Sequence, residues 1–258
     1  QSRLVTSGPG ALSYLAMNTE REGLKDLKVR QAINYAVDKN TYRIAGGGEI
    51  SGDYATTLIT PGIPGRVDYD LYPAGPEGDV EKAKSLLAES GADLGPLTLL
   101  TKNSATDVAQ AEAIQQALAR VDITVEIRSV DTNTFSADAT NDEGDYDLAL
   151  TSWQPDYPSP FGNIQPLFDS SQIGGGNYNI SRYSNPEVDD LIQQATGTVD
   201  AAAAEKIWAE ADKRIMEDAP IVPLTYNRNS FLHGSNVENF IIGEFPAYPV
   251  YFKASLKG

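Results

Sequence analysis

The stretch that decides the fold is Asp145-Tyr-Asp-Leu-Ala-Leu-Thr-Ser-Trp-Gln-Pro-Asp-Tyr-Pro-Ser-Pro160. Its large apolar residues recur at every second position over 146–150, which is the period of a strand with one buried face. Prolines at three later positions forbid further regular pairing. They are Pro155, Pro158 and Pro160. The pattern therefore predicts a strand that ends at Trp153 and leaves this ring, Asp156 and Tyr157 at the mouth of a loop.

The loop after this predicted strand has the side chains of a binding site. A large aromatic face, a carboxylate and a phenol at one rigid position suit a cationic or amide-rich small ligand. The alternative is a proline-rich surface loop with one half-buried tryptophan. Both interpretations fit the spacing, because short motifs are weak evidence.

The composition describes an acidic globular chain. Its 258 residues are 41% hydrophobic and 22% charged, and the length allows one or two domains. The net charge of −16 argues against nucleic acid and anionic membrane surfaces as partners, since both favour a basic footprint. The simplest role of this acidity is solubility. No apolar run is long enough for a transmembrane helix, and the first residues do not form a signal-peptide pattern.

Cysteine is absent, and His233 is the sole histidine. Disulfides, thiolate zinc sites and a cysteine nucleophile are therefore excluded, as is a multi-histidine metal site. We expect a structural or exposed role for His233 rather than a catalytic one. The segment 138–147 has enough oxygen ligands for calcium, but its spacing misses the EF-hand pattern, so a solvated acidic loop is expected. We expect no metal and no cofactor.

Capping residues and apolar stripes predict a chain rich in helices. Five helices are expected to begin directly after Asp26, Asp79, Ser104, Asn185 and Asp200. Trp208 lies on the apolar stripe of the last one and is expected in the core. The segment 51–78, with repeated proline and glycine, is expected to be a long irregular loop.

Alternating apolar residues predict the strands. They are expected near 12–18, 97–101, 123–127, 221–226 and 230–232. Pro223 marks the strand 221–226 as an edge strand. The segment 97–127 reads strand, helix, strand, which predicts a parallel pair with a right-handed crossover. The strand that ends at Trp153 should join the same sheet, and ligands of such sheets gather outside the carboxyl ends of the strands.

Five motifs follow one another along the chain. They are Leu27-Lys-Val-Arg-Gln-Ala-Ile-Asn-Tyr-Ala-Val-Asp-Lys39, Asp79-Val-Glu-Lys-Ala-Lys-Ser-Leu-Leu-Ala-Glu-Ser-Gly91, Trp153-Gln-Pro-Asp-Tyr-Pro-Ser-Pro160, Asn179-Ile-Ser-Arg-Tyr-Ser-Asn-Pro-Glu-Val-Asp189 and Ala219-Pro-Ile-Val-Pro-Leu224. In this order they resemble landmarks of the solute-binding proteins of bacterial peptide/nickel-type ABC importers, the oligopeptide/dipeptide-binding family. The third resembles the W-x-x-D-Y-x-x-P signature of that family. The matching segments are those of the C-terminal half of the family.

The resemblance implies a fold class and a domain organisation. The fold is expected to be α/β: a periplasmic-binding-protein-like type II lobe with a mixed sheet flanked by helices, plus hinge and C-terminal segments of a second, mostly missing lobe. Residues 1–18 would form an inter-lobe hinge strand and residues 19–220 the α/β ligand-binding lobe. Residues 221–258 would form the return hinge and a C-terminal segment that belongs to the other lobe. Asn18 and Tyr226 would mark the hinge.

The resemblance also implies a non-catalytic function. The parent protein would be the extracytoplasmic solute-binding component of an ABC importer, and it would hold a peptide or similar small solute between two lobes. The ligand-binding residues implied are Ser152, Trp153, Gln154, Asp156, Tyr157 and Arg182. Residues 152–154 would pair with a peptide backbone, Trp153 would wall a side-chain pocket, and Asp156 would meet an α-ammonium. An exposed salt bridge is the alternative role for Arg182.

Some peptide-binding relatives carry a basic residue shortly before the tryptophan, for the ligand carboxylate. Leu150 and Thr151 occupy that region here, so the recognition of a carboxylate is in doubt. The partners implied are a small-molecule or peptide ligand and an ABC permease in the membrane, with no nucleic acid. We expect a monomer outside the cytoplasm, in the periplasm or as a membrane-anchored lipoprotein, with the signal segment outside this chain. Three alternatives stay open: the same scaffold for a sugar, an opine or chelated nickel; an acidic hydrolase; and a peptide chaperone or signalling adaptor.

Overall fold

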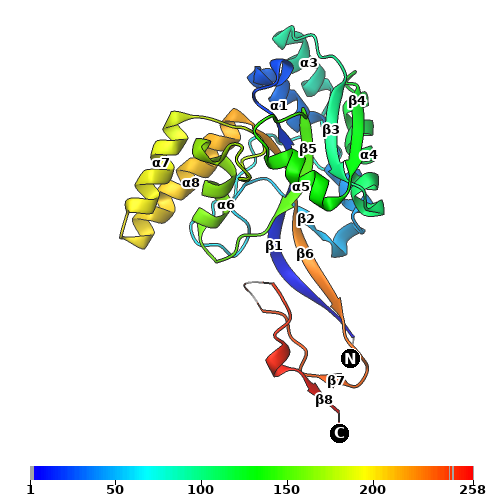
Figure 1. Ribbon diagram of the computed structural model, residues 1–258, viewed down its shortest axis with the longest axis vertical. Coiled ribbons are helices and arrows are strands. Elements are labelled where there is room, and N and C mark those ends of the chain that lie inside the picture. Colours follow the sequence, from blue (N-terminus) through cyan, green and yellow to red (C-terminus); the bar gives the residue numbers. More distant parts are fainter. Residues whose placement is uncertain (1–2, 244, 246, 258) are drawn as a thin grey trace.

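A six-stranded mixed sheet runs through the molecule (Figure 1). The computed structural model describes residues 3–243, 245 and 247–257. The strand order is β2-β6-β1-β5-β3-β4, with parallel pairing between β3 and its neighbours β4 and β5 and antiparallel pairing elsewhere. The strands are β1 (Leu4–Met17), β2 (Gly52–Tyr54), β3 (Leu97–Lys102), β4 (Val125–Val130), β5 (Leu148–Trp153) and β6 (Ile221–Leu232). The predicted mixed sheet is confirmed.

Helices cover both faces of this sheet (Figure 1). The α-helices are α1 (Leu27–Ala36), α2 (Lys39–Ala45), α3 (Val80–Ser90), α4 (Ala105–Ala119), α5 (Thr132–Thr140), α6 (Pro160–Phe168), α7 (Pro186–Gly197) and α8 (Ala201–Asp218). The described single-turn 3-10 helices are η1 (Glu22–Lys25), η2 (Gly48–Ile50), η3 (Ser170–Gln172) and η4 (Tyr251–Lys253).

Alternate residues of the central strands divide the core into two clusters. Leu15 and Leu148 point to one face and pack with buried side chains of α1, α3 and α4. Tyr14 and Ala149 point to the other face and pack with side chains of α5, α6, α7 and α8, including Trp208. The core position predicted for Trp208 is confirmed. The period-two pattern of a strand with both faces covered thus places neighbouring residues in different cores.

The five predicted helix starts are confirmed. In each case the side chain of the capping residue accepts a hydrogen bond from a backbone N–H in the first turn. The caps are Asp26, Asp79, Ser104, Asn185 and Asp200. The first helix after 97–101 also connects the parallel pair β3 and β4, as predicted. β5 joins β3 in parallel through Leu99 and Leu148, so the strand before Trp153 lies in the same sheet.

The prediction of an edge strand at 221–226 was wrong. β6 is one continuous strand that lies between β1 and β2, and β2 pairs with Thr225–Asn227. Pro223 is tolerated because it lies outside the segment covered by β2, where the register with β1 shifts near Tyr14. A bulge of this kind removes the need for a ladder N–H at that position.

The helices α2, α5 and α6 and the short strand β2 had no counterpart among the predicted elements. β2 lies inside the segment 51–78, which is otherwise irregular as expected. α6 begins with Pro160, which the sequence pattern assigned to a loop, but proline fits the first position of a helix because no partner is lost there.

Two strands extend beyond the helical layers. Residues 4–10 of β1 and 228–232 of β6 leave the lobe as a two-stranded ribbon, and the segment 233–257 follows it (Figure 1). This segment has a small antiparallel pair, β7 (Val237–Glu238) with β8 (Ser255–Leu256). We call the described residues of 4–10 and 228–257 the extension, and residues 11–227 the lobe. The domain boundaries expected at 18 and 221 stay predictions, but β1 is already buried in the lobe from Leu12 onward.

Candidate functional site

The parallel strands β3 and β5 have their carboxyl ends at the same end of the sheet, and these ends frame the candidate site. β5 pairs with β1 as far as Trp153, which lies opposite Leu12, but its pairing with β3 stops at Ala149. Within the described part of the chain, no strand therefore pairs with Thr151–Trp153 on the side that faces β3. An unpaired strand edge of this kind can receive an added strand through its backbone groups.

Two pockets lie against this edge, one on each face of the sheet. The first, which we call the polar pocket, has a volume of about 280 Å³ and lies beside α2 and the start of α4. The second, the aromatic pocket, has a volume of about 230 Å³ and lies beside α5. Lys102, Thr151 and Ser152 line both pockets. The predicted residue Ser152 thus lies at the junction of the two.

The polar pocket is built from six different elements, the strands β1, β3, β5 and β6 and the helices α2 and α4. A hydrogen-bonded row crosses its floor: Thr225 Oγ1 donates to Asn227 Oδ1 at 2.8 Å, and Asn227 Nδ2 donates to Ser13 Oγ at 2.6 Å. Burial raises the pKa of Tyr42, which also lines the pocket, to about 12, so this phenol stays neutral. The floor is therefore uncharged and polar, and it presents hydrogen-bonding groups to a bound molecule.

The aromatic pocket has Trp153 in its wall. Its ring lies 5.1 Å from the ring of Tyr178, measured between centroids, and Phe135 and Ile180 line the same space. Trp153 thus lies in the wall of a pocket, and its role toward a ligand stays a prediction. Tyr178 was not singled out from the sequence, because it lies in a loop far along the chain without a local signal.

Trp153 is held in place by a helix defect. Pro166 lies inside α6 and has no N–H for the carbonyl of Gly162, four residues earlier. The indole Nε1 of Trp153 donates to that Gly162 oxygen at 2.7 Å. The side chain thus makes the bond that the proline cannot make, and it couples the orientation of the ring to α6.

The loop after Trp153 exposes the other predicted ligand residues. Asp156 and Tyr157 are exposed and Gln154 is half-buried. The ring of Tyr157 stacks on Phe161 with centroids 6.3 Å apart, and partial burial with the nearby Asp156 charge raises its pKa. Among the described residues Asp156 forms no ion pair. Its carboxylate is therefore available to a cation from outside the lobe.

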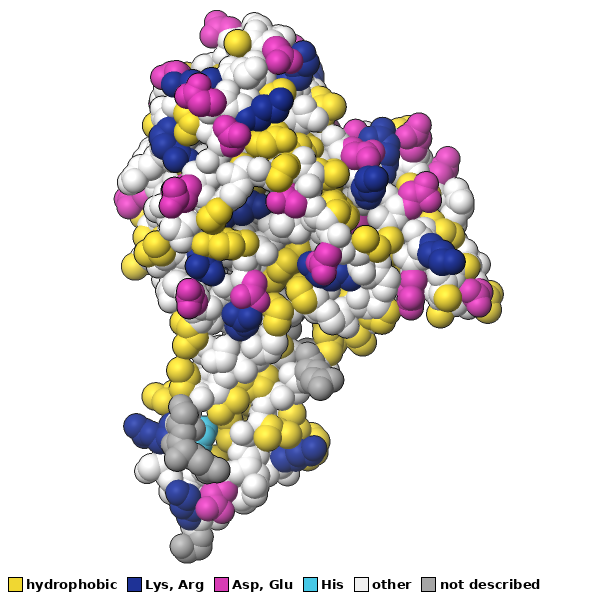
Figure 2. Space-filling view, turned by 180° about the vertical axis from the view of Figure 1, so that it is seen from behind, with side chains coloured by type: hydrophobic (Ala, Val, Ile, Leu, Met, Phe, Trp, Pro, Cys, Tyr) yellow, Lys and Arg dark blue, Asp and Glu magenta, His cyan; other side chains and the backbone are white. Residues whose placement is uncertain are grey.

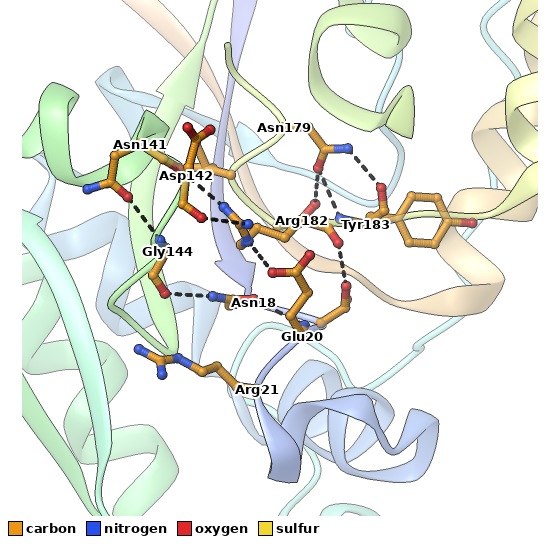
Figure 3. Close-up of polar contacts among 12 residues, drawn as sticks. Asn18, Glu20, Arg21, Asn141, Asp142, Gly144, Asn179, Arg182 and Tyr183 are labelled. Carbon is orange, nitrogen blue, oxygen red and sulfur yellow. Dashed lines mark hydrogen bonds and ion pairs between the residues drawn. The ribbon is translucent and has the colours of Figure 1, made fainter. Parts of the chain in front are cut away.

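Arg182 lies apart from these residues, in a buried cluster shown in Figure 3. Its Nε forms an ion pair with Glu20, Nη1 donates to the Asn141 oxygen at 3.3 Å, and Nη2 donates to the Asp142 oxygen at 3.0 Å. Gly144 packs so closely that an added Cβ would lie 2.8 Å from Cδ of Arg182. The side chain lines neither pocket, so its ligand role stays a prediction. The alternative of a salt bridge is confirmed, although the arginine is buried rather than exposed.

The two residues predicted to mark the hinge are both buried in the lobe. Asn18 Nδ2 donates to the oxygens of Gly144 and Tyr146, each at 3.0 Å. The hydroxyl of Tyr226 accepts from Thr57 N at 2.9 Å and donates to Thr57 O at 3.1 Å. These contacts fix both side chains locally. Their hinge role stays a prediction, while β1 and β6 leave the lobe elsewhere, near Gly10 and Arg228.

The acidic segment 138–147 is organised by hydrogen bonds. Asp142 Oδ1 accepts from Gly175 N at 2.8 Å, and Asp147 Oδ2 accepts from Thr98 N at 2.8 Å. Among the residues that the structure describes, no group of three or more acidic or histidine side chains is arranged to hold a metal ion. In the same part of the chain, no helix is both long and apolar enough to cross a membrane.

Comparisons with known proteins agree with this architecture. The glutathione-binding protein GsiB of Pectobacterium atrosepticum is 29% identical over 236 residues, which cover 89% of this chain and 45% of that protein. The heme-binding protein A of Haemophilus influenzae is 28% identical over 254 residues, which cover 96% of this chain and 45% of that protein. The chain thus spans about half the length of the curated relatives it matches.

Solved structures show the same fold. Clavulanic acid biosynthesis oligopeptide binding protein 2 has a TM-score of 0.91 at 30% identity, over 99% of this chain and 48% of that one. DppA from Helicobacter pylori, in complex with the peptide STSA, has a TM-score of 0.86 at 25% identity, over 100% of this chain and 50% of that one. The predicted type II periplasmic-binding-protein lobe is confirmed by these likenesses. The model of the bacterial extracellular solute-binding proteins, family 5 Middle, matches residues 2–175, and this chain therefore belongs to that family of solute-binding proteins.

Proposed function

We propose that this chain is the ligand-binding lobe of the extracytoplasmic solute-binding component of an ABC importer, and that the solute is a peptide or a similar small molecule. The observation that carries the proposal is the unpaired edge of β5 between two pockets, beside Trp153. An extended peptide can add to such an edge through its backbone and send alternate side chains to opposite faces. The named relatives support this solute class, because they bind glutathione, heme or a peptide.

In this proposal a second lobe closes the site. It would supply the opposite wall, and the solute would stabilise the closed form by contacting both lobes. We place the hinge in the two-stranded ribbon, where the register between β1 and β6 shifts on both sides of Pro9. Irregular pairing there allows bending at a smaller cost than within the packed lobe.

The proposed roles of the site residues follow from their positions. Residues 152–154 pair with the solute backbone, the ring of Trp153 walls the aromatic pocket, and Asp156 meets a solute ammonium. Arg182 is left out of the ligand set, because Glu20 and two carbonyls engage its guanidinium. The protein binds without catalysis, acts as a monomer with a membrane permease, and works in the periplasm or as a lipoprotein.

Native mass spectrometry of the full-length protein, purified from its own host, tests the proposal. We expect a co-purified peptide or peptide-like molecule of one mass that is released on unfolding. A sugar, an opine or a nickel chelate would keep the scaffold and replace the solute. Turnover of the bound molecule would support the acidic hydrolase instead. Failure to pull down a permease would favour the chaperone or adaptor.

The role of Asp156 is tested by replacing it with asparagine in the full-length protein. A closed site would desolvate the pair of this carboxylate with an ammonium, and loss of one partner of such a pair costs about 2–5 kcal/mol. Calorimetry should therefore show weaker binding of a free-amine peptide and little change for its N-acetylated form. Equal losses for both forms would leave Asp156 as an acid that only orders the loop.

A further inference from the structure

The polar pocket is lined by more cations than anions, although the whole chain carries a net charge of −16. Three basic residues line the polar pocket, and Asp107 is the one carboxylate among the lining residues. They are Arg43, Lys102 and Arg228. Arg228 is already paired with Asp53, so it has a structural partner. Arg43 and Lys102 are therefore the cations available to a bound molecule.

Aromatic rings, rather than carboxylates, hold these two cations. Lys102 Nζ lies 5.3 Å from the centroid of the Phe135 ring, and Cζ of Arg43 lies 4.1 Å from the centroid of the Tyr54 ring. Within the described part of the chain, neither side chain forms an ion pair, and the buried Nε of Arg43 has no hydrogen-bond partner. A ring face positions a cation without neutralising it. Both charges thus remain unpaired in a half-enclosed space, which is unfavourable until an anion enters.

The opposite face of the sheet has a different character. The aromatic pocket contains the rings of Tyr14, Phe135, Trp153 and Tyr178, together with the apolar side chains of Ala139 and Ile180 and several hydroxyl groups. The indole N–H of Trp153 is already used by Gly162, so its side chain offers only a ring surface to a ligand. A space of about 230 Å³ between ring surfaces suits an apolar or aromatic side chain.

The edge of β5 joins the two pockets, because Thr151 and Ser152 line both. Adjacent residues of a strand added at this edge would point to opposite faces of the sheet. We infer that the solute carries a carboxylate, which Arg43 in the polar pocket and Lys102 at the junction of the two pockets hold, and that a neighbouring apolar or aromatic side chain fills the aromatic pocket. This inference rests on the proposed function, since it requires an extended, peptide-like solute. It also assigns to β3 and α2 the carboxylate recognition for which the positions just before Trp153 have no basic residue.

Calorimetry with defined tetrapeptides tests the inference on the full-length protein. The probes are Ala-Glu-Phe-Ala and Ala-Phe-Glu-Ala, because the strand direction is open, and the tighter of the two serves as parent. Replacing Glu by Gln in the parent, or Phe by Ala, should each weaken binding about tenfold. Each peptide is also measured with an amidated C-terminus, which separates a side-chain carboxylate from a terminal one.

The decisive variant is Lys102→Met, which keeps the length of the side chain and removes its charge. It should weaken the parent peptide at least about tenfold and change the affinity for an analogue without any carboxylate less than about twofold. Lys206→Met is the matched control, because Lys206 is exposed on α8 and lines neither pocket; it should leave both affinities unchanged. Arg43→Gln should repeat the carboxylate-dependent loss, and higher salt should reduce the difference between Glu and Gln peptides.

Different results of these measurements would contradict the carboxylate site, the aromatic pocket or peptide binding as a whole. Equal losses in Lys102→Met for peptides with and without a carboxylate would overturn the inference and leave peptide binding intact. Binding that ignores the Phe-to-Ala change would overturn the assignment of the aromatic pocket. Failure of every peptide to bind the folded protein, judged by its circular dichroism and melting curve, would overturn the proposed function and the inference together.

Discussion

The lobe and the extension share two strands but differ in what covers them. In the lobe, β1 and β6 have a buried core on each face, and residues such as Leu15 and Val222 are fully enclosed. In the extension the same two strands continue to pair, but large apolar side chains lie exposed, as Figure 2 shows on one side of the narrow part. These side chains are Leu4, Leu232, Ile241, Tyr248, Tyr251, Phe252 and Leu256.

The comparison indicates that packing, and not strand pairing alone, stabilises these two strands. A two-stranded ribbon is marginal in water by itself, because backbone hydrogen bonds contribute little net free energy without buried apolar area. Exposed apolar residues concentrated in one segment are typical of a surface that another part of a protein covers. We therefore propose that the extension packs on the second lobe of the full-length protein.

The largest expected difference is in the hydrogen exchange of amides in the two halves of β1. In the 258-residue chain, amides of Leu12–Met17 should open only with global unfolding, at about 5–15 kcal/mol, while amides of residues 4–8 should open at a small fraction of that cost. The cause is the exposure of the apolar side chains along the ribbon, such as Leu4 and Leu232. Equal protection along the whole of β1 would contradict the proposal that the extension lacks its packing partner.

Truncation of one leucine in each region should give the next largest effect. Leu99 is 0% exposed in β3, which pairs with a strand on each side, and Leu99→Ala should lower the free energy of unfolding by about 2–5 kcal/mol through lost burial and a cavity. Leu232 is 72% exposed, and Leu232→Ala should change it by less than about 0.5 kcal/mol. Urea denaturation of the chain checks both. A large loss for Leu232→Ala would mean that the ribbon is packed in solution.

A smaller difference between the lobe and the extension should appear in how the free energy of unfolding depends on pH. Lys39 Nζ donates to the Ala55 oxygen at 2.7 Å, and burial lowers the pKa of this lysine to about 8 from its ordinary 10.5. Between these two values the unfolded chain binds more protons than the folded one, so the free energy of unfolding should rise with pH in that window. The rise should be on the order of 1–2 kcal/mol once solvent access is allowed for.

The matched pair for this effect is Lys39→Met in the lobe and Lys253→Met in the extension. Lys39→Met should remove the rise, whereas Lys253→Met should keep it, because Lys253 is exposed. Thermal melts of both variants and of the parent chain, recorded from about pH 7 to about pH 10, give the comparison. A rise that survives in Lys39→Met would assign it to other groups.

Local signals were sufficient to predict most of the lobe. Caps such as Asp26 and Ser104 are followed by clear apolar stripes, so their helices were predicted with the correct start. α5 was missed because its stripe consists of little more than Phe135 and Ala139 among residues of low helix propensity. α6 was missed because Pro160 and Pro166 argue against a helix, and the bond that compensates for Pro166 comes from Trp153 in another element.

The site was predicted only in part for a related reason. Trp153 and Ser152 lie at the end of a strong strand pattern, so their position could be read from the sequence. Lys102 directly follows the neighbouring predicted strand 97–101 and could have been found by the same rule, since parallel strands end at one edge. Arg43 had no such signal, because it reaches the pocket through the packing of α2 against α4.

The indole bond to α6 has a spectroscopic consequence. The chain has two tryptophans, and Trp208 is buried in the core and lines neither pocket. Trp153 is fixed by its bond to Gly162 and has part of its ring at the aromatic pocket. Any change in tryptophan emission on adding a solute therefore reports mainly on Trp153. The protein contains its own fluorescent indicator of occupancy, and its second fluorophore, Trp208, is buried away from both pockets.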